Sequence, residues 1–251
     1  MKTPMYLALF VGLLLIASCS KKEEDKKLTY FDPSTTKLKS VTYGGNNQTH
    51  NYTYNASGLL ESILVSDGSK TTYSYDSVSV TETSYTTGGN IATINYIELN
   101  DSGLAVNATV TDGGGTVTAH KFYTYDAGKH ITTEENYTPA NALTQRLEYA
   151  WYGSSNLLNF TIFDSTGTNG VFTFYQTFFD GPTSISNTCT GRAFMGISTY
   201  ALIRKSVRYS ALYGDNVETY DYVLDGLQRV SQKKTFDRNG VLKYTDTYTY
   251  Y

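Results

Sequence analysis

Aromatic side chains occupy alternate positions in short segments along the chain. Tyr-x-Tyr occurs five times, and Tyr149-Ala-Trp151 and Phe172-Thr-Phe174 are close variants. Residues two apart point to the same face of a β-strand, and the Thr, Ser or Asp between them points to the other. The alternation therefore predicts half-buried antiparallel strands. The five pairs are Tyr52/Tyr54, Tyr73/Tyr75, Tyr123/Tyr125, Tyr220/Tyr222 and Tyr248/Tyr250.

Turn signals separate these segments. Asn or Asp is followed three residues later by Gly at 55–58, 100–103, 164–167 and 237–240, while Val223–Gly226 keeps the glycine but lacks the leading residue. In a type I turn the first side chain bonds back to the backbone, and a final glycine tolerates positive φ and allows a bulge. We predict an all-β, antiparallel up-and-down meander of about fifteen strands, either an open or a closed, barrel-like sheet.

One stretch interrupts the hairpin rhythm. Asp180–Lys205 contains Phe194, Ile197, Ala201 and Leu202 at a spacing closer to helical. It predicts a long connection with one short helix, which could plug one end of the sheet. A connection of this length within a compact domain is usually functional.

The first residues form a secretory signal. Lys2 precedes an apolar run of about twelve residues, too short to span a bilayer as a stable helix. The run ends in Ile16-Ala17-Ser18-Cys19, which resembles the lipobox of bacterial lipoproteins and implies cleavage between Ser18 and Cys19 and lipidation of the Cys19 sulfur. We therefore divide the chain into a signal peptide (1–18), a lipidated cysteine with a charged tether (19–27) and one β domain (28–251). An ordinary signal peptide with a chance cysteine is the alternative.

The composition limits the candidate chemistry. The formal net charge is −3, and no long basic cluster indicates a nucleic-acid partner. After acylation of Cys19, Cys189 has no partner for an intramolecular disulfide and is predicted to be a small buried residue. The three histidines lack metal-ligand spacing, and no nucleophile elbow or phosphate loop occurs. We predict a non-enzymatic protein with no catalytic residues, metal or cofactor.

The aromatic rows admit two interpretations. Exposed rows could stack on sugar rings or on a partner protein, and the single tryptophan, Trp151, with Tyr149 and Tyr152, forms the candidate ligand-binding group. Alternatively, the rings cover a broad sheet that has little else to pack against. Recurrence at nearly every hairpin favours this structural role, because a binding site would be concentrated in one place.

The phrase Tyr-x-Tyr-Asp/Asn-x-x-Gly-x-Leu, best seen in "YTYNASGLLESI" and in residues 220–251, resembles the YD repeat of Rhs-type proteins. The whole layout is similar to a family of Bacteroidota outer-membrane lipoproteins of unknown function, in which a lipobox precedes a porin-like antiparallel sheet. The "KEE" sequence shortly after Cys19 resembles their surface-export signal, which is a short motif. These resemblances imply a lipid-anchored outer-membrane protein that faces either the cell exterior or the periplasm.

Three functions remain open. The leading hypothesis is a non-enzymatic, lipid-anchored surface interaction or structural module, with a glycan or a surface protein as the candidate partner. The first alternative is a glycan-binding lipoprotein that uses aromatic rows. The second is an integral outer-membrane barrel, which the Thr, Ser, Lys and Asp between the aromatics disfavour because a spanning barrel presents an apolar band to lipid.

Overall fold

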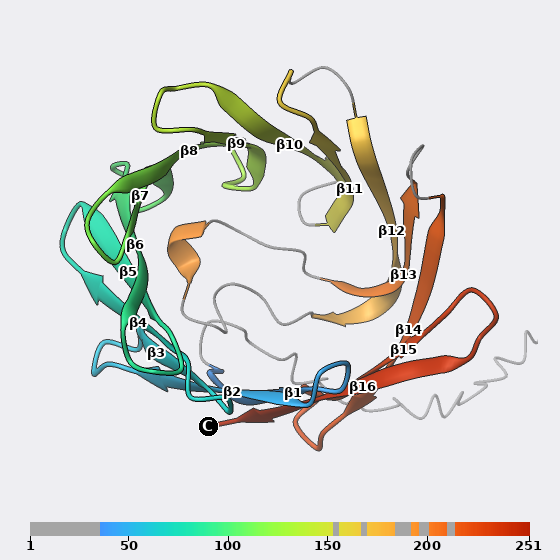
Figure 1. Ribbon diagram of the computed structural model, residues 1–251. Helices are drawn as coiled ribbons and strands as arrows, with labels where there is room; N and C mark the ends of the chain where they lie inside the picture. Colours follow the sequence, from blue (N-terminus) through green and yellow to red (C-terminus); the bar gives the residue numbers. More distant parts are fainter. Residues whose placement is uncertain (1–35, 153–155, 167–169, 184–191, 196–200, 210–213) are drawn as a thin grey trace, which may run out of the picture.

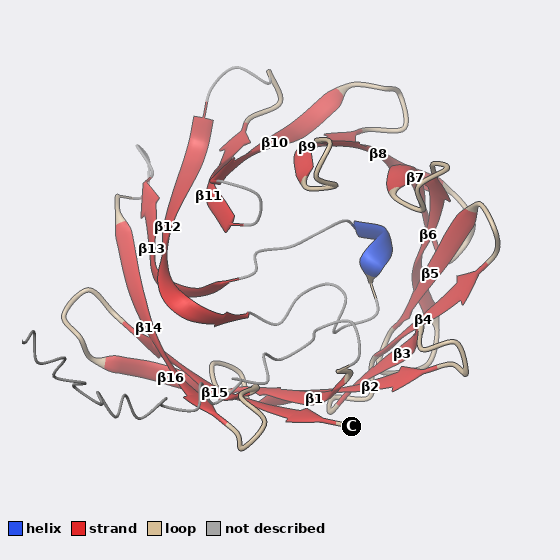
Figure 2. Ribbon diagram, turned by 180° about the vertical axis from the view of Figure 1, so that it is seen from behind, coloured by secondary structure: helices blue, strands red, loops and turns tan. Residues whose placement is uncertain are grey.

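A computed structural model describes residues 36–152, 156–166, 170–183, 192–195, 201–209 and 214–251. The described strands form one closed antiparallel barrel (Figures 1 and 2). The sixteen strands are β1 (Leu38–Tyr43), β2 (Gln48–Tyr54), β3 (Leu60–Val65), β4 (Lys70–Tyr75), β5 (Ser79–Tyr85), β6 (Ile91–Leu99), β7 (Ala105–Asp112), β8 (Val117–Tyr125), β9 (Ile131–Tyr137), β10 (Leu143–Tyr152), β11 (Asn156–Phe163), β12 (Gly170–Thr183), β13 (Ala201–Tyr209), β14 (Asn216–Leu224), β15 (Val230–Phe236) and β16 (Leu242–Tyr250).

Every strand pairs with its neighbours in the chain, so the predicted antiparallel meander is confirmed. The sequence left closure open, and the pairing of β1 with β16 decides it: Val41 lies opposite Tyr248, and Thr42 lies opposite Thr247. Closure removes both sheet edges, which would otherwise be available for pairing with another chain. It also divides every strand into residues that face the lumen and residues that face outward.

The hairpin after β2 shows how the turn signal works. The Asn55 side-chain oxygen accepts hydrogen bonds from the backbone N–H groups of Ser57 and Leu59, both at 3.0 Å. Gly58 has a φ of 74°, and the register of β2 and β3 shifts between Thr53 and Tyr54. The predicted type I turn with a glycine and a bulge is confirmed here.

The interpretation of Val223–Gly226 as the next such turn is wrong. The turn begins at Asp225, whose Oδ1 accepts hydrogen bonds from the backbone N–H groups of Leu227 and Arg229, both at 2.9 Å. Gln228, at a φ of 61°, takes the left-handed position that glycine fills elsewhere, whereas Gly226 does not. The leading Asp is present after all, and it sets the position of the turn more strongly than the glycine does.

This position of the turn predicts how the stability of the barrel responds to substitution of Gln228 and of Gly226. Gln228→Gly is expected to stabilise the barrel, by up to about 1 kcal/mol, because glycine adopts positive φ without the steric cost that glutamine pays. Gly226→Ala is expected to be neutral or slightly stabilising, because a Cβ there meets no atom within 4 Å. Urea unfolding of both variants checks this, with Gly240→Ala, at a φ of 78°, as the destabilised control. Strong destabilisation by Gly226→Ala would contradict the assigned turn.

The two faces of the barrel wall differ in composition. Lumen positions carry the aromatic pairs and the core, whereas outward positions carry mostly hydroxyl, amide and charged side chains. For example, Tyr52 is buried while Asn51 and Thr53 on either side are exposed. The buried core cluster is Leu38, Val41, Tyr52, Leu60, Tyr73, Val80, Ile97, Ala105, Ala108 and Phe194.

The described part of the long connection lies in the lumen, where the sequence had allowed a plug. Its short 3-10 helix, η1 (Ala193–Met195), lies inside the ring of strands (Figures 1 and 2), and Phe194 is buried in the core cluster. The predicted limits were wrong, because β12 continues to Thr183 and β13 begins at Ala201. Ala201 and Leu202 therefore belong to a strand and not to the helix, while Ile197 and Cys189 lie outside the described residues.

Candidate functional site

The second tyrosine connects adjacent strands in four of the five Tyr-x-Tyr pairs. The exception is Tyr125, whose buried hydroxyl has no hydrogen-bond partner among the described residues. In the other four pairs, the hydroxyl donates a hydrogen bond to a backbone carbonyl near the start of the preceding strand, where the bulges disturb the regular ladder. The bonds run from Tyr54 to Leu38 at 2.8 Å, from Tyr75 to Leu60 at 2.9 Å, from Tyr222 to Ile203 at 2.9 Å and from Tyr250 to Val230 at 2.8 Å. The recurring pairs thus have a structural role, whereas the sequence alone had left their role open.

Trp151 occupies the same place in β10. Its indole Nε1 donates to the Ile131 carbonyl at 2.7 Å, and its ring lies 4.6 Å from that of His130. Tyr149 faces the lumen and stacks on Phe160 at 5.9 Å. Tyr152 lies at the end of β10, and its side chain is outside the described residues. The structure therefore places Trp151 in the wall and Tyr149 in a lumen-facing aromatic row, and ligand binding by this group stays a prediction.

His130 and Asp126 form a side-chain pair beside Trp151. The Nδ1 atom of the buried His130 lies 3.0 Å from Asp126 Oδ2, and its Nε2 has no hydrogen-bond partner among the described residues. Asp126 Oδ1 also accepts the His130 backbone N–H at 2.9 Å, as Asp225 does in its own turn. An Asp–His pair can serve as a base in catalysis, but this one caps a turn beneath an indole ring.

A charged cluster in the lumen fixes the connection that carries η1. Arg192 approaches Glu82 on β5 at 3.1 Å, and the Asn95 amide donates to the other Glu82 oxygen at 2.9 Å. The Arg192 guanidinium also lies 5.8 Å from the centre of the Tyr73 ring. Sequence reasoning missed this cluster because its members are far apart in the chain. The available signal was the break in the repeat at 180–205.

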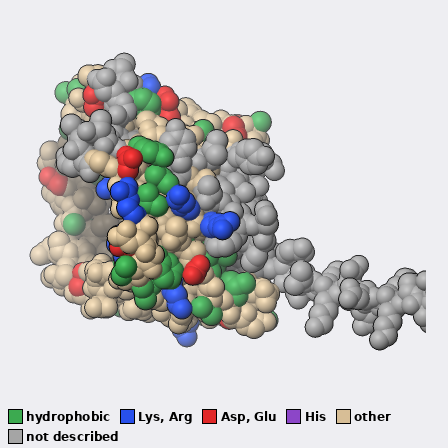
Figure 3. Space-filling model, turned by 90° about the vertical axis from the view of Figure 1, so that its right-hand side faces the viewer, with side chains coloured by type: hydrophobic (Ala, Val, Ile, Leu, Met, Phe, Trp, Pro, Cys, Tyr) green, Lys and Arg blue, Asp and Glu red, His purple; other side chains and the backbone are tan. Residues whose placement is uncertain are grey.

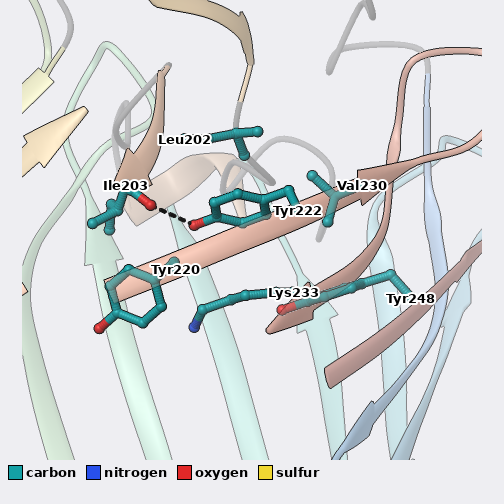
Figure 4. Close-up of a pocket in the computed structure, with 7 residues that line it drawn as sticks. All are labelled: Leu202, Ile203, Tyr220, Tyr222, Val230, Lys233 and Tyr248. Atoms are coloured by element: carbon teal, nitrogen blue, oxygen red, sulfur yellow. Dashed lines mark hydrogen bonds between the residues drawn. The ribbon is translucent and has the colours of Figure 1, made fainter. Parts of the chain in front are cut away.

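A second lumen feature is a pocket of about 180 Å³ between β13 and β16 (Figure 4). The Lys233 ammonium lies 4.7 Å from the centre of the Tyr220 ring and 3.8 Å from Asp246. Burial raises the pKa of the phenols of Tyr220, Tyr222 and Tyr248 further above the physiological range. The residues that line the pocket are Leu202, Ile203, Tyr220, Tyr222, Val230, Lys233 and Tyr248.

The described residues hold no group of three or more His, Cys, Asp or Glu side chains that could bind a metal ion. No helix in the described ranges has the length and the apolar character needed to cross a bilayer. Ser18 and Cys19, the predicted cleavage and lipidation residues, and the tether at 19–27 lie outside the described residues.

The barrel is similar to two solved structures. A porin-like protein from Bacteroides uniformis ATCC 8492 matches with a TM-score of 0.65 and 18% identity, over 89% of this chain and 99% of that chain. A porin-like protein from Bacteroides vulgatus ATCC 8482 matches with a TM-score of 0.57 and 12% identity, over 85% and 98%. The chain has a porin-like fold. At these identities the likeness establishes the fold alone.

The other comparisons add little to this fold. No family model matches the sequence, and no curated protein matches it. The structure of TcdB2-TccC3 matches with a TM-score of 0.33 over 13% of that chain, which is too low to relate the two folds. The similarity to Rhs-type YD repeats therefore stays a resemblance in sequence.

Proposed function

We propose that this protein is a lipid-anchored barrel that stands in water at the outer membrane and acts as a non-enzymatic surface interaction or structural module. The observation that supports it most strongly is the polar outer wall. Across β2 to β5, one outward row consists of Thr53, Ser62, Thr72 and Thr83. Across β10 to β12, another consists of Glu148, Thr161 and Thr173.

These outward side chains bond to one another across the strands. Hydroxyl pairs include Thr53 with Ser62 at 2.8 Å and Ser40 with Thr249 at 2.7 Å. Charged residues share this face at Glu98, Arg146, Lys205, Asp221 and Lys234. Figure 3 shows one side of the wall, where polar and backbone atoms are interspersed with charged side chains and small hydrophobic patches. A spanning barrel instead presents a continuous apolar band to lipid. The wall thus disfavours the integral-barrel alternative.

The interior supports a packed module in preference to an open channel. Tyrosines face the lumen from several strands, and Phe194 packs edge-on against Tyr75 with ring centres 6.4 Å apart. The Arg192–Glu82 pair holds this segment against the wall. Aromatic packing of this kind gives the barrel a core, whereas a porin lumen is lined by water and polar groups.

The topology supports attachment at one end of the barrel. β1 begins and β16 ends at the same end, and the Tyr251 backbone N–H donates to the Lys37 carbonyl at 3.1 Å. The turns after even-numbered strands, including the Asn55 turn, share this end, which we call the tether end. A tether leading to a lipidated Cys19 would leave from there, so the turns after odd-numbered strands would point away from the bilayer.

Changing Cys19 tests the anchor. In the full chain, Cys19→Ser combined with an ordinary signal cleavage site is expected to move essentially all of the protein from the membrane to the soluble fraction. The unchanged chain is expected to resist extraction by alkaline carbonate and to incorporate a labelled fatty acid, which the variant does not. Retention of the unlipidated variant in the washed membrane would contradict the proposal and would favour the integral barrel.

Proteolysis of intact cells separates the two possible orientations. A surface-displayed barrel is expected to lose its distal turns to an added protease, whereas a periplasmic one is protected. A protein of the periplasm in the same cells must stay intact for the result to count. Protection of the barrel would exclude display at the cell surface but would not contradict the proposed lipid anchor.

A further inference from the structure

The outer wall, which is mostly polar, carries a group of aromatic side chains on β6 to β9. Tyr96 and Phe122 point outward and are 48% and 45% exposed. Tyr137 on β9 belongs to the same face. The register shows this strand by strand: Tyr96 lies opposite Thr109, Thr109 opposite His120, and His120 opposite Tyr137. We call this group (Tyr96, Thr109, His120, Phe122 and Tyr137) the β6–β9 platform.

The platform is ordered by the strand register. Tyr96, Thr109, His120 and Tyr137 form one continuous row across four adjacent strands, so Tyr96 and Tyr137 stand roughly 14 Å apart along it. Phe122 lies in the next row and meets Tyr137 edge-to-face, with ring centres 5.5 Å apart. The aromatic side chains are thus held on a continuous sheet and not on a loop.

Hydrogen-bonding groups are interleaved with the rings. The Tyr137 hydroxyl donates to Glu135 Oε2 at 2.9 Å, and this bond is the main reason that the pKa of the Tyr137 phenol is raised. The Asn107 amide donates to Glu98 Oε2 at 2.7 Å. Both carboxylates retain acceptor capacity on the outer surface. Aromatic faces beside carboxylate and amide groups match the alternating C–H faces and hydroxyls of a sugar chain.

The charges on and around the platform narrow the ligand class. Glu98, Glu135 and Glu148 point outward. Arg146 on β10 lies opposite Glu135 on the same face, and its guanidinium is 2.7 Å from the Glu148 carboxylate. The local balance is therefore negative, which opposes phosphate, sulfate and uronate groups. The interleaved carboxylates also disfavour a protein partner, because charged residues are depleted at the centres of protein interfaces.

We propose that the β6–β9 platform binds a neutral polysaccharide. The proposal rests on the role as an interaction module and supplies a ligand class for it. It also places the site on the outer wall, away from Tyr149 and Trp151. One sugar ring stacks on Phe122 and Tyr137, a further part of the chain reaches Tyr96, and the carboxylates of Glu98 and Glu135 accept hydrogen bonds from sugar hydroxyls.

Affinity electrophoresis of the full mature chain tests the platform. The neutral probes are xylan, mannan and a mixed-linkage glucan, and the acidic probes are pectin and heparin. Retardation by at least one neutral probe and by neither acidic probe is expected. Phe122→Ala and Tyr137→Ala are each expected to weaken that binding roughly tenfold or more, as aromatic anchors at interfaces do.

Tyr209→Ala is the matched control, because Tyr209 is an outward aromatic of similar exposure, 46%, on the distant strand β13. It is expected to leave binding unchanged, and circular dichroism establishes that every variant is folded. The proposal is overturned if no neutral probe is retarded, if the acidic probes bind as well, or if folded platform variants bind like the unchanged chain. Fractionation of the Cys19 variant is independent of these results, so failure of the anchor and failure of the platform are distinguishable.

Discussion

Raising the pH from about 9 to about 12 is expected to unfold the barrel in one cooperative transition. Burial raises the pKa of Tyr75 and of Tyr125 to about 12, from an ordinary value of 10.0. Burial is also the main cause of raised phenol pKa values at Tyr52, Tyr73, Tyr123, Tyr149, Tyr220, Tyr222 and Tyr248.

The direction of this pH effect follows from the number of protons bound by the folded and the unfolded chain. Between pH 10 and pH 12 the unfolded chain has lost phenol protons that the folded barrel still holds, so the free energy of unfolding falls as the pH rises. The stabilisation is complete below about pH 10 and is lost progressively as the pH approaches the folded-state values. Because many tyrosines share one lumen, their contributions to this pH dependence add.

Tyrosinate absorbance and far-ultraviolet circular dichroism, recorded together, check this expectation. The buried phenols should ionise in the same step in which the β-sheet signal is lost. Tyr123→Phe is expected to move the midpoint to higher pH, because it removes a buried ionisable group. Tyr96→Phe removes an outward phenol that is 48% exposed and is expected to leave the midpoint unchanged. Ionisation of all tyrosines near pH 10 with an intact sheet signal would show that the rings do not face a packed interior.

Local structure could be predicted because its determinants are close in sequence. An aromatic pair two residues apart and an Asn or Asp three residues before Gly are enough to place a strand and its hairpin. The error at Val223–Gly226 shows the limit of that rule. The prediction relied on Gly226, but the hydrogen bonds to Asp225 place the turn two residues later and leave Gln228 at positive φ.

Features that depend on distant residues could not be predicted. Closure depends on β1 meeting β16 from opposite ends of the domain, which follows from the combined twist and tilt of all the strands. The Arg192–Glu82 contact joins residues 110 positions apart. For Trp151, the sequence showed its place in an aromatic pair, but its bond to the Ile131 carbonyl required the register of β9 and β10.

The β6–β9 platform could be predicted only in part from the sequence. Phe122 has the opposite parity to the lumen-facing pair Tyr123/Tyr125 in the same strand, and this signal is visible in the sequence. Its neighbours Tyr96 and Tyr137, however, lie on other strands and join it only through the register. Parity could have marked Phe122 as an outward aromatic, although the prediction did not use it, whereas the sheet was needed to bring the three aromatics together.

Leu60→Ala is expected to lower the free energy of unfolding by about 2–5 kcal/mol, the usual range for a buried leucine whose removal leaves a cavity. Leu60 is 0% exposed and packs in the core cluster with Leu38, Tyr52 and Tyr73. Its carbonyl also accepts the Tyr75 hydroxyl, so movement of the backbone at this position would disturb a second strand. Urea unfolding followed by circular dichroism measures the loss.

Leu64→Ala is the matched control, because Leu64 lies four residues along the same strand on the outer wall and is 47% exposed. In a water-facing barrel its removal is expected to change the free energy of unfolding by no more than about 0.5 kcal/mol. If that outer wall were instead buried in lipid or in an assembly, the smaller side chain would lose contacts in that state as well. A small difference between Leu60→Ala and Leu64→Ala in water would contradict the assignment of inner and outer faces, on which both the water-exposed module and the polysaccharide platform depend.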